Sequence, residues 1–330
     1  MNDNFNIEIV LVAPLDWGLG HATRCIPIIR ALLPHYKVLV ACNEKQKALL
    51  TKELLPVQFL DLEGYNIDYA KQKWWMPFKI LLQVPKILKA IRRENKWLQE
   101  AIDEYKIDVV ISDNRYGLHT TKTPCVFITH QLTIQTPFAW LTSFLQKWNY
   151  KLINQFNACW VPDVHDEKNV AGVLSQPTQL PALPVNYLGI LSRFNKDEAT
   201  PFRYEYCFLL SGPEPQRTIL ENKILQDVGK VNGKIILLRG LPTANNTLNN
   251  LPNVTIYNHL DGENLEQVLQ QSEYIIARSG YTSVMELLSL QKKMILIATP
   301  GQTEQEYLSK HLMNLGWCFS VEQSVFNLEK

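Results

Sequence analysis

The sequence predicts an α/β protein made of two doubly wound parallel-sheet domains that face a cleft. Short runs of apolar and β-branched residues alternate with segments of helical periodicity through both halves of the chain. With 330 residues, of which 46% are hydrophobic, the chain is long enough for about two domains with cores of their own. Prolines gather between the two alternating series, in the segment 176–203. We therefore expect one domain at 1–200 and a second at 201–330.

The first half of the chain holds the expected strands and helices of the first domain. Amphipathic helical patterns cover 22–33 and about 78 to 104. Apolar strand-like runs occur at 7–13, 37–42, 56–60, 107–113, 125–129 and 158–162. Strands that alternate with helices in this way favour a parallel sheet covered on both faces.

The second half repeats this alternation after a short strand at 185–190. Expected strands lie at 204–211, 233–239, 253–257, 273–279 and 293–299, and expected helices at 215–229, 263–271, 281–290 and 303–314. In open parallel sheets, ligands bind just beyond the carboxyl ends of the strands. Polar residues that directly follow a strand are therefore the first candidates for a functional site.

Composition narrows the class of protein. A formal net charge of +1 gives no overall field that would attract nucleic acid. The six cysteines form no CxxC and no metal-binding spacing, so we expect reduced, buried thiols. The N-terminus has no secretory signal pattern, and no stretch reaches the roughly 18 apolar residues of a membrane helix. We expect a cytoplasmic protein that binds no nucleic acid.

The loop after the first strand reads DWGLGH and ends in His21. Gly18 and Gly20 resemble the start of a dinucleotide-binding fingerprint, but Thr23 stands where its third glycine would be. We expect His21 on a turn at the start of a helix, where the helix dipole disfavours the imidazolium form. His21 is therefore either a neutral base near pH 7 or only a cap of the helix.

Polar residues also follow the fourth and fifth strands expected in the first half of the chain. Asp113 and Arg115 come at the end of the strand at 107–113, and His130 comes at the end of the strand at 125–129. A carboxylate at Asp113 would orient His21 or act on an acceptor hydroxyl itself. A purely structural role is equally open, in which these residues cap the turns that follow their strands.

The strongest signal in the chain is the segment 273–312. Its first strand ends in Arg278, Ser279 and Gly280, and the glycine lets the backbone approach a ligand closely. The helix that follows would present free N–H groups and the positive end of its dipole to a diphosphate. Ser279 and Thr282 add hydroxyl donors, and Glu286 lies one turn further on the same face, where its carboxylate suits a ribose.

Two further loops carry residues that suit a sugar nucleotide. Gln302, Glu304 and Gln305 follow the strand at 293–299, and amides and carboxylates bind the paired hydroxyls of a sugar. Gly212 follows the strand at 204–211, and Arg217 enters the next helix, which suits phosphate oxygens. Taken one at a time, each of these residues is equally well a helix cap or a surface group.

The segment 273–312 resembles the donor-binding segment of GT-B glycosyltransferases, and in particular glycosyltransferase family 28. The patterns that carry the resemblance are SG-x-T-x-x-x-EL and K-x-ILI-x-x-PGQ-x-EQ. The GLGH sequence is also similar to the N-terminal loop of that family, although DWGLGH stands here in place of GGTGGH. The best-known member adds N-acetylglucosamine to a lipid-linked peptidoglycan precursor. The resemblance implies GT-B architecture, with a Rossmann-like acceptor-binding domain followed by a Rossmann-like domain that binds a nucleotide-sugar donor.

The resemblance also implies roles for individual residues. It makes His21 the candidate base on the acceptor side, and we place Asp113 with it as a catalytic residue. It implies that Ser279, Gly280 and Thr282 bind the diphosphate. It also implies that Glu286 binds the ribose and that Glu304 and Gln305 bind the donor sugar. The expected donor site comprises Gly212, Arg217, Arg278, Ser279, Gly280, Thr282, Glu286, Gln302, Glu304 and Gln305, and the expected acceptor side comprises Gly18, Gly20, Arg115 and His130.

The expected reaction is the transfer of a sugar from a nucleoside diphosphate, with a UDP-sugar as co-substrate, to an acceptor hydroxyl of the cell envelope or of a lipid carrier. The sequence has no DxD triplet to hold a divalent cation, so we expect metal independence and no cofactor. A nucleotide-sugar hydrolase of the same fold is the second reading, because the hydrolase of the pseudaminic acid pathway has a similar G-x-GH-x-x-RC start, matched here by residues 18–25. An epimerase of this fold and a non-catalytic nucleotide-sugar-binding protein are also compatible with these residues.

A basic stretch at 71–96 is interleaved with aromatic residues, including Trp74, Trp75 and Phe78, and contains one acid, Glu94. A second aromatic stretch spans 137–150. Basic amphipathic segments with tryptophan can lie in a membrane interface. We expect either peripheral contact with anionic lipid on the inner face of the membrane through 71–96, or a domain helix with a buried apolar face and a solvated basic face.

Overall fold

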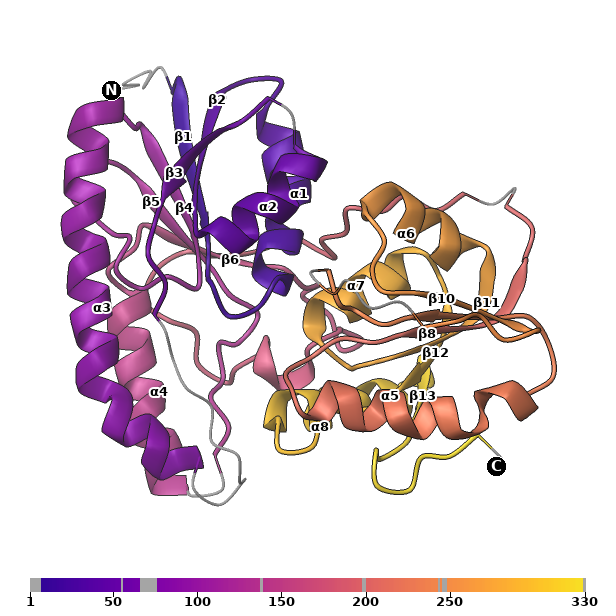
Figure 1. Cartoon of the computed structure of the whole chain (residues 1–330). Coiled ribbons are helices and arrows are strands. Elements are labelled where there is room, and N and C mark those ends of the chain that lie inside the picture. Colours follow the sequence, from indigo (N-terminus) through magenta and orange to yellow (C-terminus); the bar gives the residue numbers. More distant parts are fainter. Residues whose placement is uncertain are drawn as a thin grey trace. The chain divides into compact units, whose positions relative to one another are not determined.

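The computed structural model describes residues 7–54, 56–65, 76–136, 139–197, 200–242, 244 and 248–328, without the side chains of 76–84 and 139. The chain forms two compact units, Met1–Arg193 and Phe194–Lys330. Their boundary falls inside the proline-containing segment 176–203. Each unit is built around one parallel sheet (Figure 1). The predicted fold class of two doubly wound α/β domains is confirmed.

The first unit contains a seven-stranded sheet in the order β3-β2-β1-β4-β5-β6-β7. The order reverses between β1 and β4, which is the position where doubly wound sheets bind their ligands. The register pairs Pro14, the last residue of β1, with Asp113, the last residue of β4. The strands are β1 (Ile9–Pro14), β2 (Lys37–Cys42), β3 (Gln58–Asp61), β4 (Val109–Asp113), β5 (Cys125–Ile128), β6 (Ala158–Val161) and β7 (Val185–Tyr187).

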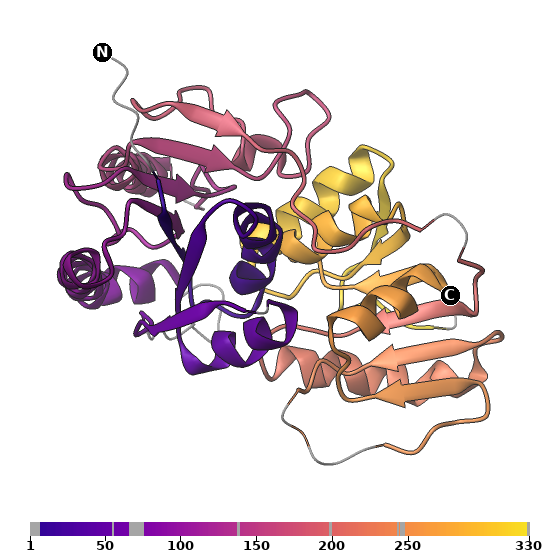
Figure 2. The same ribbon diagram turned by 90° about the horizontal axis from the view of Figure 1, so that it is seen from above.

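Helices cover both faces of this sheet (Figure 1). Helices α1 and α2 pack on the face that carries Val10 and Val12, whereas α3 packs on the face of Leu11 and Ala13. Helix α4 packs beside α3 through Leu152, and Figure 2 shows α3 and α4 almost end-on. The helices are α1 (Gly20–Leu32), α2 (Glu44–Glu53), α3 (Met76–Tyr105) and α4 (Ala139–Ile153), with a 3₁₀ turn at Gly172–Leu174.

The second unit contains a six-stranded sheet in the order β10-β9-β8-β11-β12-β13. Leu209 pairs with Ala277, and Ala277 pairs with Leu296, so the loops that follow β8, β11 and β12 start side by side. The strands are β8 (Tyr204–Leu209), β9 (Ile235–Leu238), β10 (Val254–Tyr257), β11 (Ser272–Ala277), β12 (Lys293–Leu296) and β13 (Cys318–Ser320). The helices are α5 (Gln216–Asp227), α6 (Gly262–Gln270), α7 (Tyr281–Ser289) and α8 (Thr303–Asn314), with a 3₁₀ turn at Val228–Lys230.

The basic aromatic stretch is described only in part. Residues 71–75, with Trp74 and Trp75, lie outside the described residues, and the rest forms the first part of α3. Buried side chains of this helix, such as Ile91 and Leu98, belong to the core of the unit, while basic side chains lie on its exposed face. Within the residues that the structure describes, no helix is long and apolar enough to cross a membrane.

Candidate functional site

The first unit places His21 in the opening turn of α1, directly beyond the end of β1. The helix begins at Gly20, one residue before His21, and its N-cap Leu19 makes no side-chain cap. The turn before the helix needs a glycine at Gly18, whose φ of +78° is in the left-handed region. The side chain of His21 remains 16% exposed. His21 is thus held at the sheet edge where ligands bind in this class of fold.

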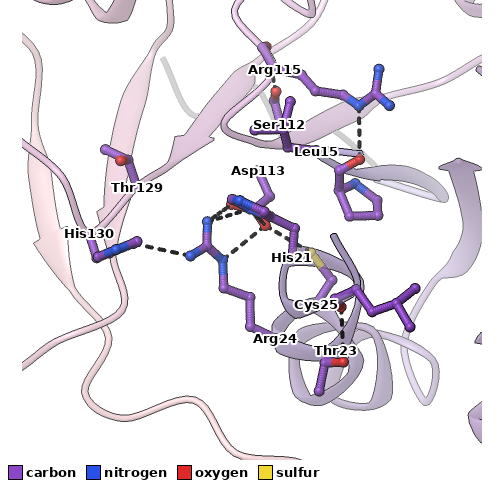
Figure 3. Close-up of polar contacts among 12 residues, drawn as sticks. Leu15, His21, Thr23, Arg24, Cys25, Ser112, Asp113, Arg115, Thr129 and His130 are labelled. Carbon is purple, nitrogen blue, oxygen red and sulfur yellow. Dashed lines mark hydrogen bonds and ion pairs between the residues drawn. The ribbon is translucent and has the colours of Figure 1, made fainter. Parts of the chain in front are cut away.

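Asp113 is the nearest carboxylate to this histidine. Its side chain is fully buried at the end of β4, and its Oδ2 atom lies 2.9 Å from Nδ1 of His21. Figure 3 shows the two side chains pointing toward each other from α1 and β4. The structure therefore brings together the two residues that the sequence analysis placed as a pair, and their catalytic role stays a prediction.

The sequence analysis missed Arg24, which lies at the centre of the cluster (Figure 3). Its Nε atom donates to Oδ2 of Asp113 at 2.9 Å, and its Nη2 atom binds Oδ1. Nη2 also lies 2.8 Å from Nδ1 of His21, and Nη1 lies 3.1 Å from Nδ1 of His130. The local signals were the position of Arg24, three residues after His21 on the same side of the helix, and the G-x-GH-x-x-RC pattern that contains it.

Charge and burial set the protonation of this cluster. Burial alone would raise the pKa of Asp113, but the charge of Arg24 and the contacts with His21 hold it at about 2. Burial and then the Arg24 guanidinium lower the pKa of His21, against the opposing effect of Asp113. The expected neutral histidine is thus supported, although burial and Arg24 are the causes here rather than the helix dipole.

Arg115 does not join this cluster, and its expected place on the acceptor side stays a prediction. Its guanidinium is fully buried and points away from His21 (Figure 3). Nε donates to the carbonyl oxygen of Pro14 at 2.8 Å, and Nη1 donates to Glu94 at 2.6 Å. Tyr65 donates to the other Glu94 oxygen at 2.6 Å. Arg115 therefore braces the end of β1 against α3, while its Nη2 atom is buried without a hydrogen-bond partner among the described residues.

In the second unit, Gln305 links the loops that follow β11 and β12. Ser279 donates its hydroxyl to the backbone oxygen of Gln305 at 2.8 Å. The side-chain oxygen of Gln305 accepts from the backbone N–H of Thr299 at 3.0 Å, and its amide nitrogen donates to Gln302 at 2.6 Å. Three residues expected at the donor site, Ser279, Gln302 and Gln305, are thus brought together.

Two glycines leave space beside this linked pair of loops. A Cβ atom at Gly280, the N-cap of α7, would meet only the side-chain amide of Gln305, at 4.0 Å. A Cβ atom at Gly212 would lie 3.6 Å from the hydroxyl of Thr299. That hydroxyl is buried and has no hydrogen-bond partner within the described residues. A buried hydroxyl without a partner beside an accessible backbone is the arrangement expected where a polar ligand binds.

The remaining carboxylates expected at the donor site lie on the helices that start here. Glu286 lies four residues after Thr282 on α7 and is 7% exposed, whereas Glu304 is half-buried in the first turn of α8. Their proposed contacts with ribose and sugar stay predictions. In the described part of the chain, no three His, Cys, Asp or Glu side chains gather as a metal site would.

Arg278, expected at the donor site, is buried among backbone carbonyls, and its Nε atom has no hydrogen-bond partner among the described residues. It is 1% exposed, and its Nη1 atom donates to the carbonyl oxygens of Ile297 and Ala298, both at 3.2 Å. Its Nη2 atom donates to the carbonyl oxygen of Gln216 at 2.8 Å. The guanidinium therefore ties the loop after β12 to the start of α5, and burial lowers its pKa to about 10.

Arg217 also binds partners in its own unit. It is 5% exposed and donates to Glu214 at 2.6 Å and to the hydroxyl of Thr218 at 2.6 Å. A second carboxylate, that of Glu221, lies 3.2 Å from Nη1. A guanidinium with these contacts holds the loop after β8 on α5, so its expected role in phosphate binding is corrected to a structural one.

Comparison with known proteins finds glycosyltransferases that are similar to this chain. Residues 214–330 match the model of the glycosyltransferase family 28 C-terminal domain. A curated relative from Sulfurihydrogenibium sp. (strain YO3AOP1) is 27% identical over 154 residues. It is a UDP-N-acetylglucosamine--N-acetylmuramyl-(pentapeptide) pyrophosphoryl-undecaprenol N-acetylglucosamine transferase. That alignment takes in 46% of this chain and 43% of the relative, so the chain matches less than half of the relative's length.

Solved structures resemble the chain over nearly its whole length. MurG of Acinetobacter baumannii has a TM-score of 0.56 at 14% identity, and the match covers 97% of this chain and 87% of MurG. The spinosyn rhamnosyltransferase SpnG, complexed with thymidine diphosphate, has a TM-score of 0.65 at 12% identity, covering 95% and 86%. At these identities the likeness shows the fold alone. Residues 214–330 therefore match a glycosyltransferase family 28 C-terminal domain, in a chain that has the GT-B fold.

Proposed function

We propose that the protein is a glycosyltransferase that moves a sugar from a nucleoside diphosphate to an acceptor hydroxyl. The observation that carries this proposal is the family match over 214–330, which includes the loops after β11 and β12. The curated relative is a transferase by name, which favours transfer over hydrolysis, epimerisation or simple binding.

The donor diphosphate would bind at the start of α7. Gly280 puts no Cβ in the way of the backbone N–H groups there, and a helix N-terminus attracts anions. The unpartnered hydroxyl of Thr299 would donate a hydrogen bond to the same ligand. Glu286 would accept from the ribose, and Glu304 and Gln305 would bind the sugar. We propose a uridine nucleotide, as in the name of the curated relative.

His21 would perform the proton transfer. Its Nε2 atom would take the proton of the acceptor hydroxyl as that oxygen forms a bond to the anomeric carbon. The bond from the anomeric carbon to the diphosphate oxygen breaks, and the leaving diphosphate keeps the electron pair. Donors at the α7 N-terminus would stabilise the charge that develops on it, and we propose no metal and no cofactor for this step. Asp113 would orient the imidazole through Nδ1.

The acceptor is proposed to be lipid-linked or part of the cell envelope, reached at the inner face of an anionic membrane. Trp140 and Phe144, one turn apart on α4, are 70% and 59% exposed. Exposed basic residues of the neighbouring α3 include Lys86, Lys89 and Arg92. Aromatic and basic side chains on adjacent helices suit the headgroup region of anionic lipid. The name of the curated relative describes an undecaprenol-linked substrate, which agrees with this proposal.

Thermal unfolding with UDP, dTDP, GDP, ADP and CMP tests the donor assignment. A ligand present at a hundred times its dissociation constant stabilises the folded state by about 2.7 kcal/mol. We expect UDP to give the largest shift, and a Glu286→Ala variant to lose that shift. If none of the five nucleotides moves the transition, the donor site proposed at α7 is wrong.

A further inference from the structure

Arg24 is a buried cation that touches every other polar member of the cluster around His21. Its guanidinium binds both oxygens of Asp113, and its Nη atoms reach the Nδ1 atoms of His21 and His130 (Figure 3). Arg24 is 3% exposed and Asp113 is fully buried. His21 and His130 thus both contact the buried ion pair of Arg24 and Asp113. A carboxylate alone would be enough to orient a histidine, so the arginine needs a separate explanation.

The donor chemistry of arginine restricts what each histidine can do. A guanidinium only donates hydrogen bonds, so Nδ1 of His130, 3.1 Å from Nη1, is placed as an acceptor. At His21, Nδ1 faces an Arg24 donor at 2.8 Å and an Asp113 acceptor at 2.9 Å. The same Oδ2 atom of Asp113 also accepts from Nε of Arg24. Arg24 and His21 therefore compete for Oδ2 of Asp113. Arg24 and Asp113 likewise compete for Nδ1 of His21.

We infer that Arg24 is a positioning residue for His21, which shares Asp113 with the histidine and keeps the imidazole neutral and anchored at Nδ1. A buried carboxylate alone beside a histidine favours the imidazolium form. The guanidinium that contacts both residues opposes that effect, because its own positive charge disfavours a second one on the ring. His21 makes both of these contacts through Nδ1, and Nε2 is open to accept a proton in the tautomer whose Nδ1–H donates to Asp113. The use of Nε2 as a base rests on the proposed function, whereas the control of His21 by Arg24 does not.

The groups that face His21 come from three elements and agree with this inference. Arg24 and Cys25 come from α1, Asp113 from β4, and His130 from the segment after β5. Burial, followed by the charge of Asp113, raises the pKa of the Cys25 thiol, so it adds no charge. The pKa of His21 itself is lowered by burial and by Arg24. Arg24 and Asp113 are therefore the two charges that decide its protonation.

An NMR titration of the full chain labelled with ¹⁵N-histidine tests the inference without any substrate. The chain has seven histidines, and a His21→Asn variant assigns the signal of interest. In Arg24→Met, we expect the titration midpoint of His21 to rise by about one pH unit or more, the effect of one charge at this distance. The matched control is Arg30→Met on the same helix, whose side chain is 44% exposed and pairs with Glu53. It should leave the midpoint unchanged.

A second comparison keeps the test decisive if Arg24→Met does not fold, since that variant leaves Asp113 buried without its cation. Asp113→Asn and the double variant Arg24→Met/Asp113→Asn differ only in the arginine, and we expect the higher His21 midpoint in the double variant. Equal midpoints in either comparison would overturn the inference. Because the experiment measures only the titration of His21, its result does not depend on whether the protein transfers a sugar.

Discussion

Nδ1 of His21 lies 2.9 Å from Oδ2 of Asp113, although 92 positions separate the two residues in the chain. The strand order explains this contact, because β1 and β4 are neighbours and Pro14 pairs with Asp113 at their ends. The chain leaves β1 through a short glycine-containing turn and enters α1 at Gly20. The imidazole of His21 therefore lies next to the end of β4, where it contacts the buried carboxylate of Asp113.

Asp113 should be a major contributor to the stability of the first unit. Replacing it with asparagine leaves the buried Arg24 guanidinium without its carboxylate, and breaking a buried ion pair costs about 3 to 5 kcal/mol. We expect urea unfolding of Asp113→Asn to show a loss of that order. The matched control is Asp103→Asn, which breaks the exposed pair with Lys122 and should cost less than about 1 kcal/mol. Similar losses in both variants would contradict the buried cluster.

The free energy of unfolding should decrease in two separate pH ranges as the pH is lowered. The pKa of His21 is lower in the folded chain than its usual 6.5, so the unfolded chain binds the proton first and stability is lost as the pH falls below about 6.5. The pKa of Asp113 is about 2 instead of 3.8, so its contribution, about 2 kcal/mol, is lost between these values. Denaturant unfolding from about pH 7.5 down to about pH 2 measures both ranges. A His21→Asn variant that kept the full loss just below pH 6.5 would contradict the first assignment.

Gly280→Ala should separate ligand binding from folding. The φ of Gly280 is −71°, and a Cβ atom there meets only the Gln305 amide at 4.0 Å, so the variant should unfold like the wild type. A methyl group would, however, stand where the diphosphate approaches the backbone, and nucleotide binding should weaken at least tenfold, or about 1.4 kcal/mol. Calorimetric titration with UDP measures this change, and wild-type affinity would contradict it.

Gly240→Ala is the matched control for that experiment. A Cβ atom at Gly240 would lie 2.2 Å from the carbonyl oxygen of Leu210, and its φ is +69°. This variant should therefore lose stability, because the backbone must move. Gly280→Ala is thus expected to weaken nucleotide binding without lowering stability, whereas Gly240→Ala is expected to lower stability.

Thr299→Val should weaken nucleotide binding while leaving the fold intact. The Thr299 hydroxyl is buried and has no partner within the described residues, so removing it should not lower the free energy of unfolding. If it donates to the bound nucleotide, its loss should raise the dissociation constant about fivefold, or about 1 kcal/mol. Thr299→Ser keeps the hydroxyl and should bind nearly as well as the wild type. Equal affinity of the Val and Ser variants would remove Thr299 from the donor site.

Membrane contact can be tested by flotation with anionic vesicles. We expect the protein to float with phosphatidylglycerol vesicles at low salt and less at high salt, because part of the attraction is electrostatic. The double variant Trp140→Ser/Phe144→Ser should float less. Phe319→Ser, which removes an aromatic side chain that is 62% exposed on the second unit, is the control and should float normally. No flotation of the wild type at low salt would exclude the proposed contact.

Much of the fold could be predicted because buried parallel strands are continuous apolar runs. The strand at 37–42 and the helix at 303–314 were expected at the residues where they occur. Helix α2 was missed because its face is mostly polar, although Asn43 and Gln46 form a capping box that signals its start. Strand β13 was missed because it is a three-residue edge strand with little apolar pattern.

The polar interior was harder to predict than the strands. Arg24 contacts residues 89 and 106 positions away, and no local pattern encodes such partners. Arg115, Arg217 and Arg278 all follow strands, where a ligand contact was expected. The structure shows instead that backbone carbonyls and carboxylates of their own units take up these guanidinium groups. An arginine that follows a strand is equally suited to brace the loops and to bind a phosphate, and only the fold decides between them.

The most direct test of glycosyl transfer is the release of UDP from a UDP-sugar in the presence of a membrane extract that supplies acceptors. The wild type and His21→Ala should bind UDP equally, because the proposed contacts with UDP are all made by the loops after β11 and β12 and by α7. We predict that the wild type releases UDP only when the extract is present, and that His21→Ala is slower by at least a hundredfold, as expected for a lost general base. Release at the wild-type rate by His21→Ala would contradict the assignment of His21 as the base.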